Sequence, residues 1–378
     1  MRKICVVSGS RADYGLLYLT MKRLQESKKI DFQLLVTGSH LSRSFGYTYK
    51  EILNDGFKAN SKIKILNETG FSISSIVSRS IKSFSKEFTK LNPDIILLLG
   101  DRYEIFSAAI SATLSKIPIA HIHGGEVSEG AFDESFRHAI TKMSHLHFAS
   151  CSLHKKRIIQ LGENPKKVFN VGAPGIERLK KLKLLSKDNL EKSLNIKFRK
   201  KNVLVTFHPE TLSKRSISDQ ISPLLSCLKQ KKDWGIIITK ANSDPGGEEI
   251  NLQLKEFAKS NSTNTFLFDN LGQQNYFSIL KLADVMIGNS SSAIIESASF
   301  NTPSLNIGNR QGGRLKPKNV FDVKNKTTDI RKALDNLSKK REGIKNPYDG
   351  GQTSKKILKV LEEFDLNNIL KKNFFDIS

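Results

Sequence analysis

The stretch LNPDIILLLGDRYEIF, residues 91–106, decides the fold expected for this chain of 378 residues. Its aliphatic run ends at Gly100-Asp101, which is typical of a buried strand in a parallel sheet. A second run, PIAHI (118–122), leads in the same way into HIHGGEVSEGAFDESFRH (121–138). In open α/β sheets the loops after parallel strands line the ligand crevice, so we expect both blocks to contribute to one site.

Strands and amphipathic helices alternate along the chain in two series, which is the pattern of parallel βαβ units. The first series runs from KICVVSG (3–9) to KVFNVG (167–172), and the second from NVLVTF (202–207) to PSLNIG (303–308). The chain is long enough for two domains with separate cores. The sequence therefore predicts an α/β fold of two Rossmann-like, doubly wound domains that face each other across a cleft.

The boundaries of these domains are expected where the character of the sequence changes. Residues 175–202 are rich in lysine and leucine and have no glycine after Gly175, which suits a connection. We therefore expect an N-terminal domain over 1–174 and a C-terminal nucleotide-binding domain over 175–353. The last segment, 354–378, begins with a helix whose apolar stripe would be exposed unless it crossed back onto the first domain.

Composition excludes several classes of protein. The net charge of +24 would suit a nucleic-acid-binding protein, but no stretch interleaves arginine with aromatic residues, so we expect no nucleic-acid partner. Cys5, Cys151 and Cys227 lack the spacing of disulfides or zinc sites and fit a reducing cytoplasm, where we expect the protein to be. We expect neither export nor membrane insertion, because the N-terminus lacks a signal peptide and no apolar run approaches about 18 residues.

The blocks after the two central strands are rich in carboxylates. Asp101 follows the first strand, and Glu126, Asp133 and Glu134 follow the second, around a Gly-Gly turn. A solvated helix face is the ordinary explanation for any one of them. Four carboxylates at the ends of two buried strands indicate instead a site for acid–base chemistry in the first domain.

Three histidines, His121, His123 and His138, lie in the second of these blocks. A histidine in such a loop is more often a hydrogen-bonded scaffold residue than a catalyst, so their claim on catalysis is weaker. The spacing of His121, His123 and Glu126 matches no zinc pattern, and we therefore predict no metal site.

Two loops have the composition of phosphate-binding turns. SGSRADYG (8–15) joins the first strand to the first helix and supplies Arg11, although such turns are frequent in α/β folds. GNSSSAIIESA (288–298) follows a strand of the second series and offers the hydroxyl and N–H groups of Ser290 and Ser291.

Other polar residues of the second series extend this pattern. His208 lies just beyond a strand end, and Arg310 and Arg314 lie on the glycine-rich loop GNRQGGR (308–314). Glu296 follows the serines by one to two helical turns, near the place that a ribose diol would reach. Together these residues indicate a nucleoside diphosphate site.

The motifs, in their order along the chain, resemble those of the hydrolysing UDP-N-acetylglucosamine 2-epimerases of bacterial sialic-acid and legionaminic-acid pathways. The resemblance covers roughly residues 3–360 and implies a GT-B-like fold, a UDP-sugar substrate and no cofactor. We also expect a homo-oligomer, a dimer or a tetramer. The motifs that carry the resemblance are GSRADYGLL, VTGSHLS, GDRYEIF, HIHGGEVSEGAFDE, RHAITKMSHLHF, VGAPG, TFHPET, GNSSSAIIESA and GNRQGGR.

The resemblance implies that UDP is eliminated from UDP-GlcNAc to give 2-acetamidoglucal, and that water then adds to give free N-acetylmannosamine. Non-hydrolysing relatives carry an Arg-Pro-Glu turn near the N-terminus and a Glu-Ala-Gly block after the fourth strand. This chain has Arg11-Ala12-Asp13 and His123-Gly124-Gly125-Glu126 at those places. The departure favours the hydrolysing branch.

Site residues follow from the same resemblance. It implies that Asp101, Glu126 and Asp133 are the catalytic carboxylates, with the adjacent Glu134 as the alternative to Asp133. It places Arg137 near the sugar or the diphosphate. The remaining binding residues that it implies are Glu296 on the uridine ribose and, on the diphosphate, Arg11, His208, Ser290, Ser291 and Arg314.

Two other enzymatic activities remain open. The first is the same reaction on UDP-N,N'-diacetylbacillosamine, giving 2,4-diacetamido-2,4,6-trideoxymannose, and the residues that contact C4 and C6 of the sugar would decide it. The second is a GT-B glycosyltransferase, which would share the nucleotide-binding half but needs no carboxylate cluster in the first domain.

Overall fold

The computed structural model describes the chain apart from residues 44, 67–71, 130, 243–244, 338–342 and 378. Gly130, in the second of the carboxylate-rich blocks, therefore lies outside the described residues. The chain divides into two compact units, which are described separately. The first unit comprises Met1–Glu126, Asp133–Arg178 and Tyr348–Ser378, and the second comprises Val127–Phe132 and Leu179–Pro347.

The first unit is built on a seven-stranded sheet in the order β3-β2-β1-β4-β5-β6-β7. Every described pairing in it is parallel. The strands are β1 (Arg2–Ser8), β2 (Ile30–Thr37), β3 (Ser61–Ile63), β4 (Ile95–Leu99), β5 (Ile119–Ile122), β6 (Leu146–Ala149) and β7 (Val168–Asn170). The helices are α1 (Arg11–Glu26), α2 (Tyr49–Asn54), α3 (Ile73–Leu91), α4 (Tyr103–Leu114), α5 (Asp133–Met143), α6 (Ser152–Gln160) and α14 (Thr353–Glu363), with 3-10 turns at Gly38–Leu41 and Pro165–Lys167.

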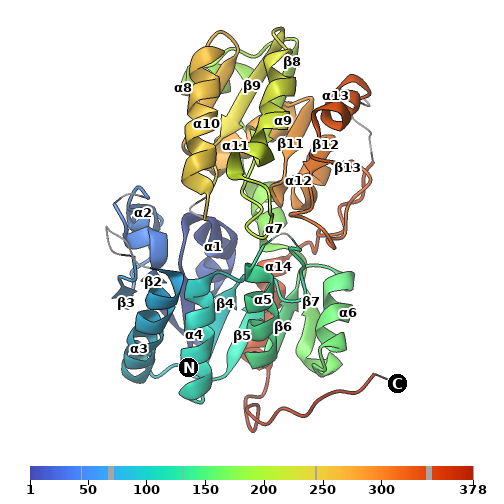
Figure 1. Ribbon diagram of the computed structural model, residues 1–378. Helices are drawn as coiled ribbons and strands as arrows, with labels where there is room; N and C mark the ends of the chain where they lie inside the picture. Colours follow the sequence, from blue (N-terminus) through green and yellow to red (C-terminus); the bar gives the residue numbers. More distant parts are fainter. Residues whose placement is uncertain (44, 67–71, 130, 243–244, 338–342, 378) are drawn as a thin grey trace. The chain divides into compact units, whose positions relative to one another are not determined.

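Alternate residues of β1 enter two different cores, because successive side chains of a strand point to opposite faces. Ile4 and Val6 pack with side chains of α1 and α14, whereas Cys5 and Val7 pack with side chains of α3, α4 and α5. Figure 1 shows these two sets of helices on opposite faces of the sheet. The sheet is therefore buried on both faces, which explains why its strands are continuous apolar runs.

The second unit repeats this plan with a six-stranded parallel sheet in the order β10-β9-β8-β11-β12-β13. Its strands are β8 (Lys201–Thr206), β9 (Trp234–Thr239), β10 (Thr265–Phe268), β11 (Val285–Gly288), β12 (Ser304–Ile307) and β13 (Val320–Val323). Its helices are α8 (Lys187–Leu194), α9 (Ile217–Lys229), α10 (Gly247–Ser260), α11 (Gly272–Leu282), α12 (Ser292–Ile295) and α13 (Thr327–Asp335), with a 3-10 turn at Ser297–Phe300. Helix α7 (Pro174–Lys181) carries the chain from the first unit into the second. Val203 and Val205 of β8 enter one core and Leu204 the other.

Each sheet has one point at which the order of its strands reverses, between β1 and β4 in the first unit and between β8 and β11 in the second. The loops that follow the two strands at such a switch point part from each other and leave a crevice. This topology confirms the prediction of two doubly wound Rossmann-like domains. It also places the blocks after β1, β4, β8 and β11 where ligands of such sheets bind.

The closing segment packs on the first unit through specific contacts. Ile357 and Leu361 of α14 are buried in the same core as β1 and α1. The hydroxyl of Thr353 donates to the carbonyl of Val171 at 2.8 Å, and Ser354 Oγ donates to the buried carboxylate of Glu177 at 2.8 Å. Among the described residues, no helix has both the length and the apolar character needed to cross a membrane.

Three histidines of the first unit, His40, His121 and His145, are buried and stay uncharged. Burial lowers the pKa of His40 and of His145 to about 4 each, and that of His121 to about 3. Unfolding returns each ring to a pKa near 6.5. Between pH 6.5 and about 4 the unfolded chain therefore binds protons that the folded unit does not. Asp13 acts in the opposite direction, because burial raises the pKa of its carboxyl to about 6.

We expect the free energy of unfolding of the first unit to fall as the pH is lowered from 7 to 5. Each histidine contributes a loss of up to about 1.4 kcal/mol per pH unit, and three histidines outweigh the single opposing carboxyl. Urea unfolding followed by circular dichroism at several pH values measures the slope. Asp13→Asn should make the loss on acidification steeper, and a flat profile in both proteins would contradict the assignment of buried neutral rings.

Candidate active site

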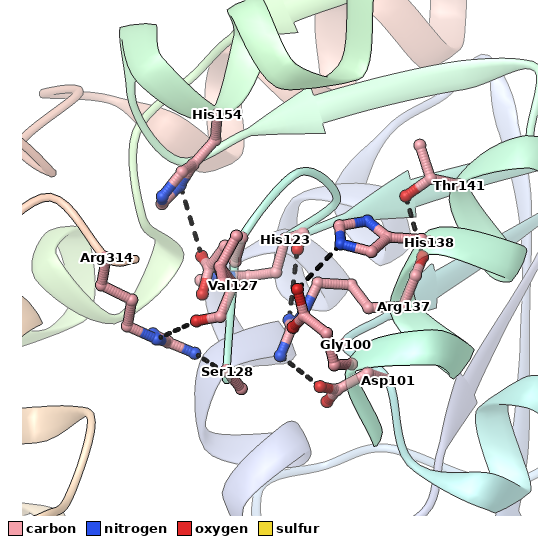
Figure 2. A network of polar contacts seen from close by, with 12 residues as sticks. Gly100, Asp101, His123, Val127, Ser128, Arg137, His138, Thr141, His154 and Arg314 are labelled. Carbon is pink, nitrogen blue, oxygen red and sulfur yellow. Dashed lines mark hydrogen bonds and ion pairs between the residues drawn. The ribbon is translucent and has the colours of Figure 1, made fainter. Parts of the chain in front are cut away.

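The loops after β4 and β5 meet α5 at the carboxyl edge of the first sheet. Asp101 follows β4, and its carboxylate forms an ion pair with the guanidinium of Arg137 on α5. Figure 2 shows this pair in the polar network around His123. The Arg137 side chain is 5% exposed, so the pair is largely removed from water. Arg137 also donates to the carbonyl of His123 at 3.4 Å.

Arg137 interacts with all of the carboxylates predicted from the sequence. Burial lowers the pKa of its guanidinium, but neighbouring negative charges more than offset that effect, and the net shift of the pKa is upward. The residues whose charges raise it are Asp101, Glu126, Glu134 and Asp133. The structure thus brings these four side chains within electrostatic range of one buried cation.

Glu126 lies in a hydrogen-bond network with His123, Ser150 and His154. Its carboxylate accepts from Nδ1 of His123 and from Oγ of Ser150, the latter at 2.7 Å. Ser150 Oγ is also 2.8 Å from Nδ1 of His154, and His154 is drawn beside this network in Figure 2. Glu126 is 2% exposed, so this carboxylate is enclosed by its partners.

His121 and the α5 carboxylates complete this edge of the sheet. His121 Nε2 lies 2.8 Å from the carbonyl of Gly100, and Nδ1 lies 3.4 Å from the hydroxyl of Thr141. The ring is buried and neutral, and it ties the loop after β4 to α5. Asp133 and Glu134 are the first two residues of α5, and Glu134 pairs with His138 one turn later at 2.8 Å.

The loop after β1 adds a buried acidic residue, Asp13, that the sequence did not single out as a site residue. Asp13 lies in the first turn of α1, whose N-cap Ser10 accepts from its backbone N–H at 3.3 Å. Burial is the main cause of its raised pKa, with Arg102 acting against the rise and Glu104 adding to it. Glu104 is itself buried and pairs with Arg102 at 2.7 Å. An acidic residue after a serine at a helix start is first interpreted as part of a helix cap, which is why Asp13 was not selected from the sequence.

Arg11, in the same loop, pairs with Glu51 at 2.8 Å, and its side chain is one-third exposed. It lies at the first position of α1. From its place in the sequence, this guanidinium is predicted to bind a diphosphate. A partly exposed pair of this kind is weak, so an anionic ligand could compete for Arg11.

The loops after β8 and β11 in the second unit are held together by neutral hydrogen bonds. The side-chain amide of Asn289 accepts from the N–H of His208 and donates to its carbonyl, both at 2.7 Å. The Nδ1 atom of His208 accepts from the N–H of Asn242 at 3.3 Å. His208 and Ser290 are buried, and Ser291 is the N-cap of the short helix α12. Glu296, at the C-cap of α12, is also buried.

The glycine-rich loop after β12 is anchored by a carboxylate. One oxygen of Glu210 accepts from the N–H groups of Asn309 and Arg310, at 2.9 and 3.2 Å. Gly308 has a φ of +76°, and a Cβ there would overlap this carboxylate, so glycine is required. Arg314 donates from Nε to the carbonyl of Val127 at 3.0 Å and from Nη2 to Oγ of Ser128 at 3.3 Å.

The predicted binding residues of the second unit therefore gather on the loops that follow β8, β11 and β12. In the part of the chain that the structure describes, no three or more His, Cys, Asp or Glu side chains are grouped so as to hold a metal ion.

Two doubly wound sheets with polar loops at both switch points define the class of the protein, a GT-B-like enzyme of two Rossmann-like domains. The crystal structure of UDP-GlcNAc 2-epimerase from Neisseria meningitidis bound to UDP-GlcNAc shares this fold. The TM-score is 0.80 with 21% sequence identity, over 95% of this chain and 99% of that chain. The chain belongs to the UDP-N-acetylglucosamine 2-epimerase family, whose sequence profile matches residues 22–362.

Three curated relatives match along their full length. The chain is 44% identical to a GDP/UDP-N,N'-diacetylbacillosamine 2-epimerase (hydrolyzing) of Campylobacter jejuni, covering 100% of this chain and 99% of the relative. It is 37% identical to polysialic acid biosynthesis protein P7 of Escherichia coli, over 100% and 98%. It is 36% identical to a UDP-N,N'-diacetylbacillosamine 2-epimerase (hydrolyzing) of Legionella pneumophila, over 98% and 99%.

We expect Arg137→Gln to lower the free energy of unfolding of the first unit by about 3–5 kcal/mol, because it leaves the buried Glu126 and the mostly buried Asp101 without their cation. Arg11→Gln is the matched control, since its pair with Glu51 is partly exposed and should cost less than about 1 kcal/mol. Urea unfolding of both variants at pH 7 makes the comparison. Equal losses would show that the Arg137 cluster is not the buried electrostatic centre of the unit.

Proposed function

We propose that this protein is a hydrolysing UDP-sugar 2-epimerase whose substrate is UDP-N,N'-diacetylbacillosamine. Its products would be 2,4-diacetamido-2,4,6-trideoxymannose and UDP. The observation that carries the proposal is the 44% identity to the Campylobacter jejuni enzyme over the whole of both chains. The Legionella pneumophila relative has the same activity in its name. These relatives favour the diacetylbacillosamine nucleotide over UDP-GlcNAc, which the motifs alone had placed first.

UDP-GlcNAc is the second candidate substrate. The Escherichia coli relative, at 37% identity, is a polysialic acid biosynthesis protein. The reaction class is the same for both sugars, because both carry an acetamido group at C2. They differ at C4 and C6, so the choice rests on residues around that side of the sugar.

The chemistry explains why carboxylates gather at the edge of the first sheet. A C2 proton is weakly acidic, so its removal needs a base held close to it, and the departing diphosphate needs positive charge and hydrogen-bond donors. We assign the acid–base work to the group formed by Asp101, Glu126 and Asp133, with Glu134 as the alternative to Asp133. Arg137 holds this group together and lies near the sugar or the diphosphate. The clustering of these carboxylates around the buried Arg137 supports this assignment over a glycosyltransferase, which has no need of such a group.

We assign the nucleotide to the loops of the second unit. His208, Ser290, Ser291 and Arg314 would hold the diphosphate, and Glu296 would bind the ribose diol. This assignment is supported by the position of the loops at the switch point between β8 and β11. That Arg11 also binds the diphosphate stays a prediction.

The cysteines Cys5, Cys151 and Cys227 are buried and free, which supports our proposal that the enzyme works in the reducing cytoplasm. The homo-oligomer and the cleft between the domains stay predictions.

Incubation of the protein with each nucleotide sugar in separate reactions tests the proposed function. We expect one UDP and one free sugar to appear per turnover, with kcat/KM at least about tenfold higher for UDP-N,N'-diacetylbacillosamine, because a site that bonds the second acetamido group rejects a sugar without it. Asp101→Asn should be at least about 100-fold slower and serves as the control.

Oxygen-18 water distinguishes this route from hydrolysis at phosphorus. Elimination breaks the bond between C1 and the diphosphate oxygen, so the label should enter the anomeric hydroxyl of the sugar. Label in the UDP, or a product that retains its nucleotide, would contradict the proposed reaction.

We expect UDP at about 100 times its Kd to stabilise the protein by about 2.7 kcal/mol, visible as a melting temperature several degrees higher. His208→Ala and Arg314→Ala should reduce this shift, because each removes a donor from the diphosphate. Lys316→Ala removes an exposed pair with Asp322 in the same unit and should leave the shift unchanged. An identical shift in all three variants would place the nucleotide elsewhere.

A further inference from the structure

One oxygen of the Glu126 carboxylate already accepts two hydrogen bonds within the protein. Oε1 accepts from both His123 and Ser150, and the residue is 2% exposed. Ser150 is in turn bonded to His154 at 2.8 Å. This oxygen of Glu126 could take up a substrate proton only at the expense of its hydrogen bonds to His123 and Ser150. These two hydrogen bonds suit Glu126 to holding the His123 ring in place.

His123, in contrast, has one ring nitrogen that is bonded to Glu126 and one that has no partner among the described residues. Its Nδ1 points at the Glu126 carboxylate, and because a carboxylate only accepts hydrogen bonds, Nδ1 carries the proton. Nε2 is then the nitrogen with the lone pair. Nε2 is buried and has no hydrogen-bond partner among the described residues, in a side chain that is 7% exposed. A buried basic nitrogen left without a partner is costly, unless a ligand supplies one.

The backbone of His123 supports this interpretation. Its φ is +69°, in the left-handed region that a non-glycine residue seldom adopts. Such a conformation costs of order 1–3 kcal/mol and persists where the surroundings impose it, often at active sites. Here Arg137 holds the carbonyl of His123 and also pairs with Asp101. Glu126 thus holds the ring of His123 and Arg137 holds its backbone carbonyl, beside the ion pair of Asp101 with Arg137 that follows β4.

We propose that His123 is a catalytic residue that takes the C2 proton through Nε2, and that Glu126 is its positioning partner. This inference rests on the proposed function and reassigns the role that the motifs gave to Glu126. Asp101 is a poorer candidate for this proton, since taking it up would break the ion pair with Arg137.

The proposed elimination moves one proton from the sugar to His123 and releases UDP. Nε2 takes the proton from C2, and the C2–H electron pair becomes the C1=C2 double bond. The bond between C1 and the diphosphate oxygen breaks, and its electron pair leaves with UDP. The imidazolium that forms lies against the Glu126 carboxylate, which stabilises it as a carboxylate stabilises a catalytic imidazolium in a triad.

Two substitutions at His123 test this role. His123→Gln keeps a polar side chain that cannot take up a proton. His123→Gly relieves the backbone, because φ near +69° favours glycine, and leaves room for added imidazole. We expect both to lower kcat at least about 100-fold while UDP still raises the melting temperature. Imidazole at tens of millimolar should then restore His123→Gly at least tenfold and leave His123→Gln unchanged.

The double variant His123→Gln with Glu126→Gln separates the two roles. A residue that acts through His123 adds nothing once His123 is gone, so the double variant should match His123→Gln within about threefold. A further fall of about 100-fold would make Glu126 itself the proton-transfer residue and overturn the proposal.

His147→Gln is the matched control, because it also removes a buried histidine from a carboxylate, Glu163, at 3.0 Å. Its kcat should stay near that of the wild type.

The wild-type protein is assayed first for free sugar and UDP. An inactive wild type would refute the proposed function and with it this inference. An active wild type with a His123→Gln variant within tenfold of its kcat, or a folded His123→Gly variant that imidazole does not restore, would refute the role of His123 alone.

Discussion

The buried guanidinium of Arg137 is the interaction on which the polar edge of the first unit depends. Asp101, Glu126, Asp133 and Glu134 all lie within its electrostatic range, and without it their mutual repulsion and desolvation would oppose folding. Because α5 begins at Asp133, Arg137 lies one turn beyond two of these carboxylates, on the same side of the helix. The same guanidinium also braces the carbonyl of His123, so charge balance and backbone geometry are set by one side chain.

The two units place different polar groups on the loops at their switch points. In both, loops that follow neighbouring strands diverge at a switch point and present polar groups. The first unit fills that place with ion pairs, such as Arg102 with Glu104. The second unit relies on the neutral amide of Asn289, which bonds both backbone groups of His208. The neutral bonds between the loops after β8 and β11 add no negative charge where a diphosphate would bind, whereas the carboxylates of the first unit are suited to moving protons.

Much of this organisation was predictable because it is local in the sequence. The aliphatic runs before Gly100 and Gly124 had to be strands buried on both faces, and parallel strands bring their carboxyl ends to one edge. Asp101 and Glu126 could therefore be selected from the sequence. Asp13 could not, because its raised pKa comes mainly from burial in the folded unit, with a contribution from Glu104, which lies 91 positions further along the chain. The partner of Arg11, Glu51, was equally invisible, since that pair joins α1 to α2.

The sequence by itself determined the elements, their order and the residue types at the ends of the strands, because apolar periodicity and turn residues act over a few positions. Only the tertiary structure decided what those side chains do to one another. The motif His123-Gly124-Gly125-Glu126 leaves open which residue faces a substrate, and a left-handed backbone at His123 rather than only at its glycine neighbours is not what local propensity favours. Ser150 from the loop after β6 and Arg137 from α5 close around the loop after β5. These contacts engage the Glu126 carboxylate and leave Nε2 of His123 without a partner among the described residues, because hydrogen bonding and burial depend on segments that meet only when the sheet forms.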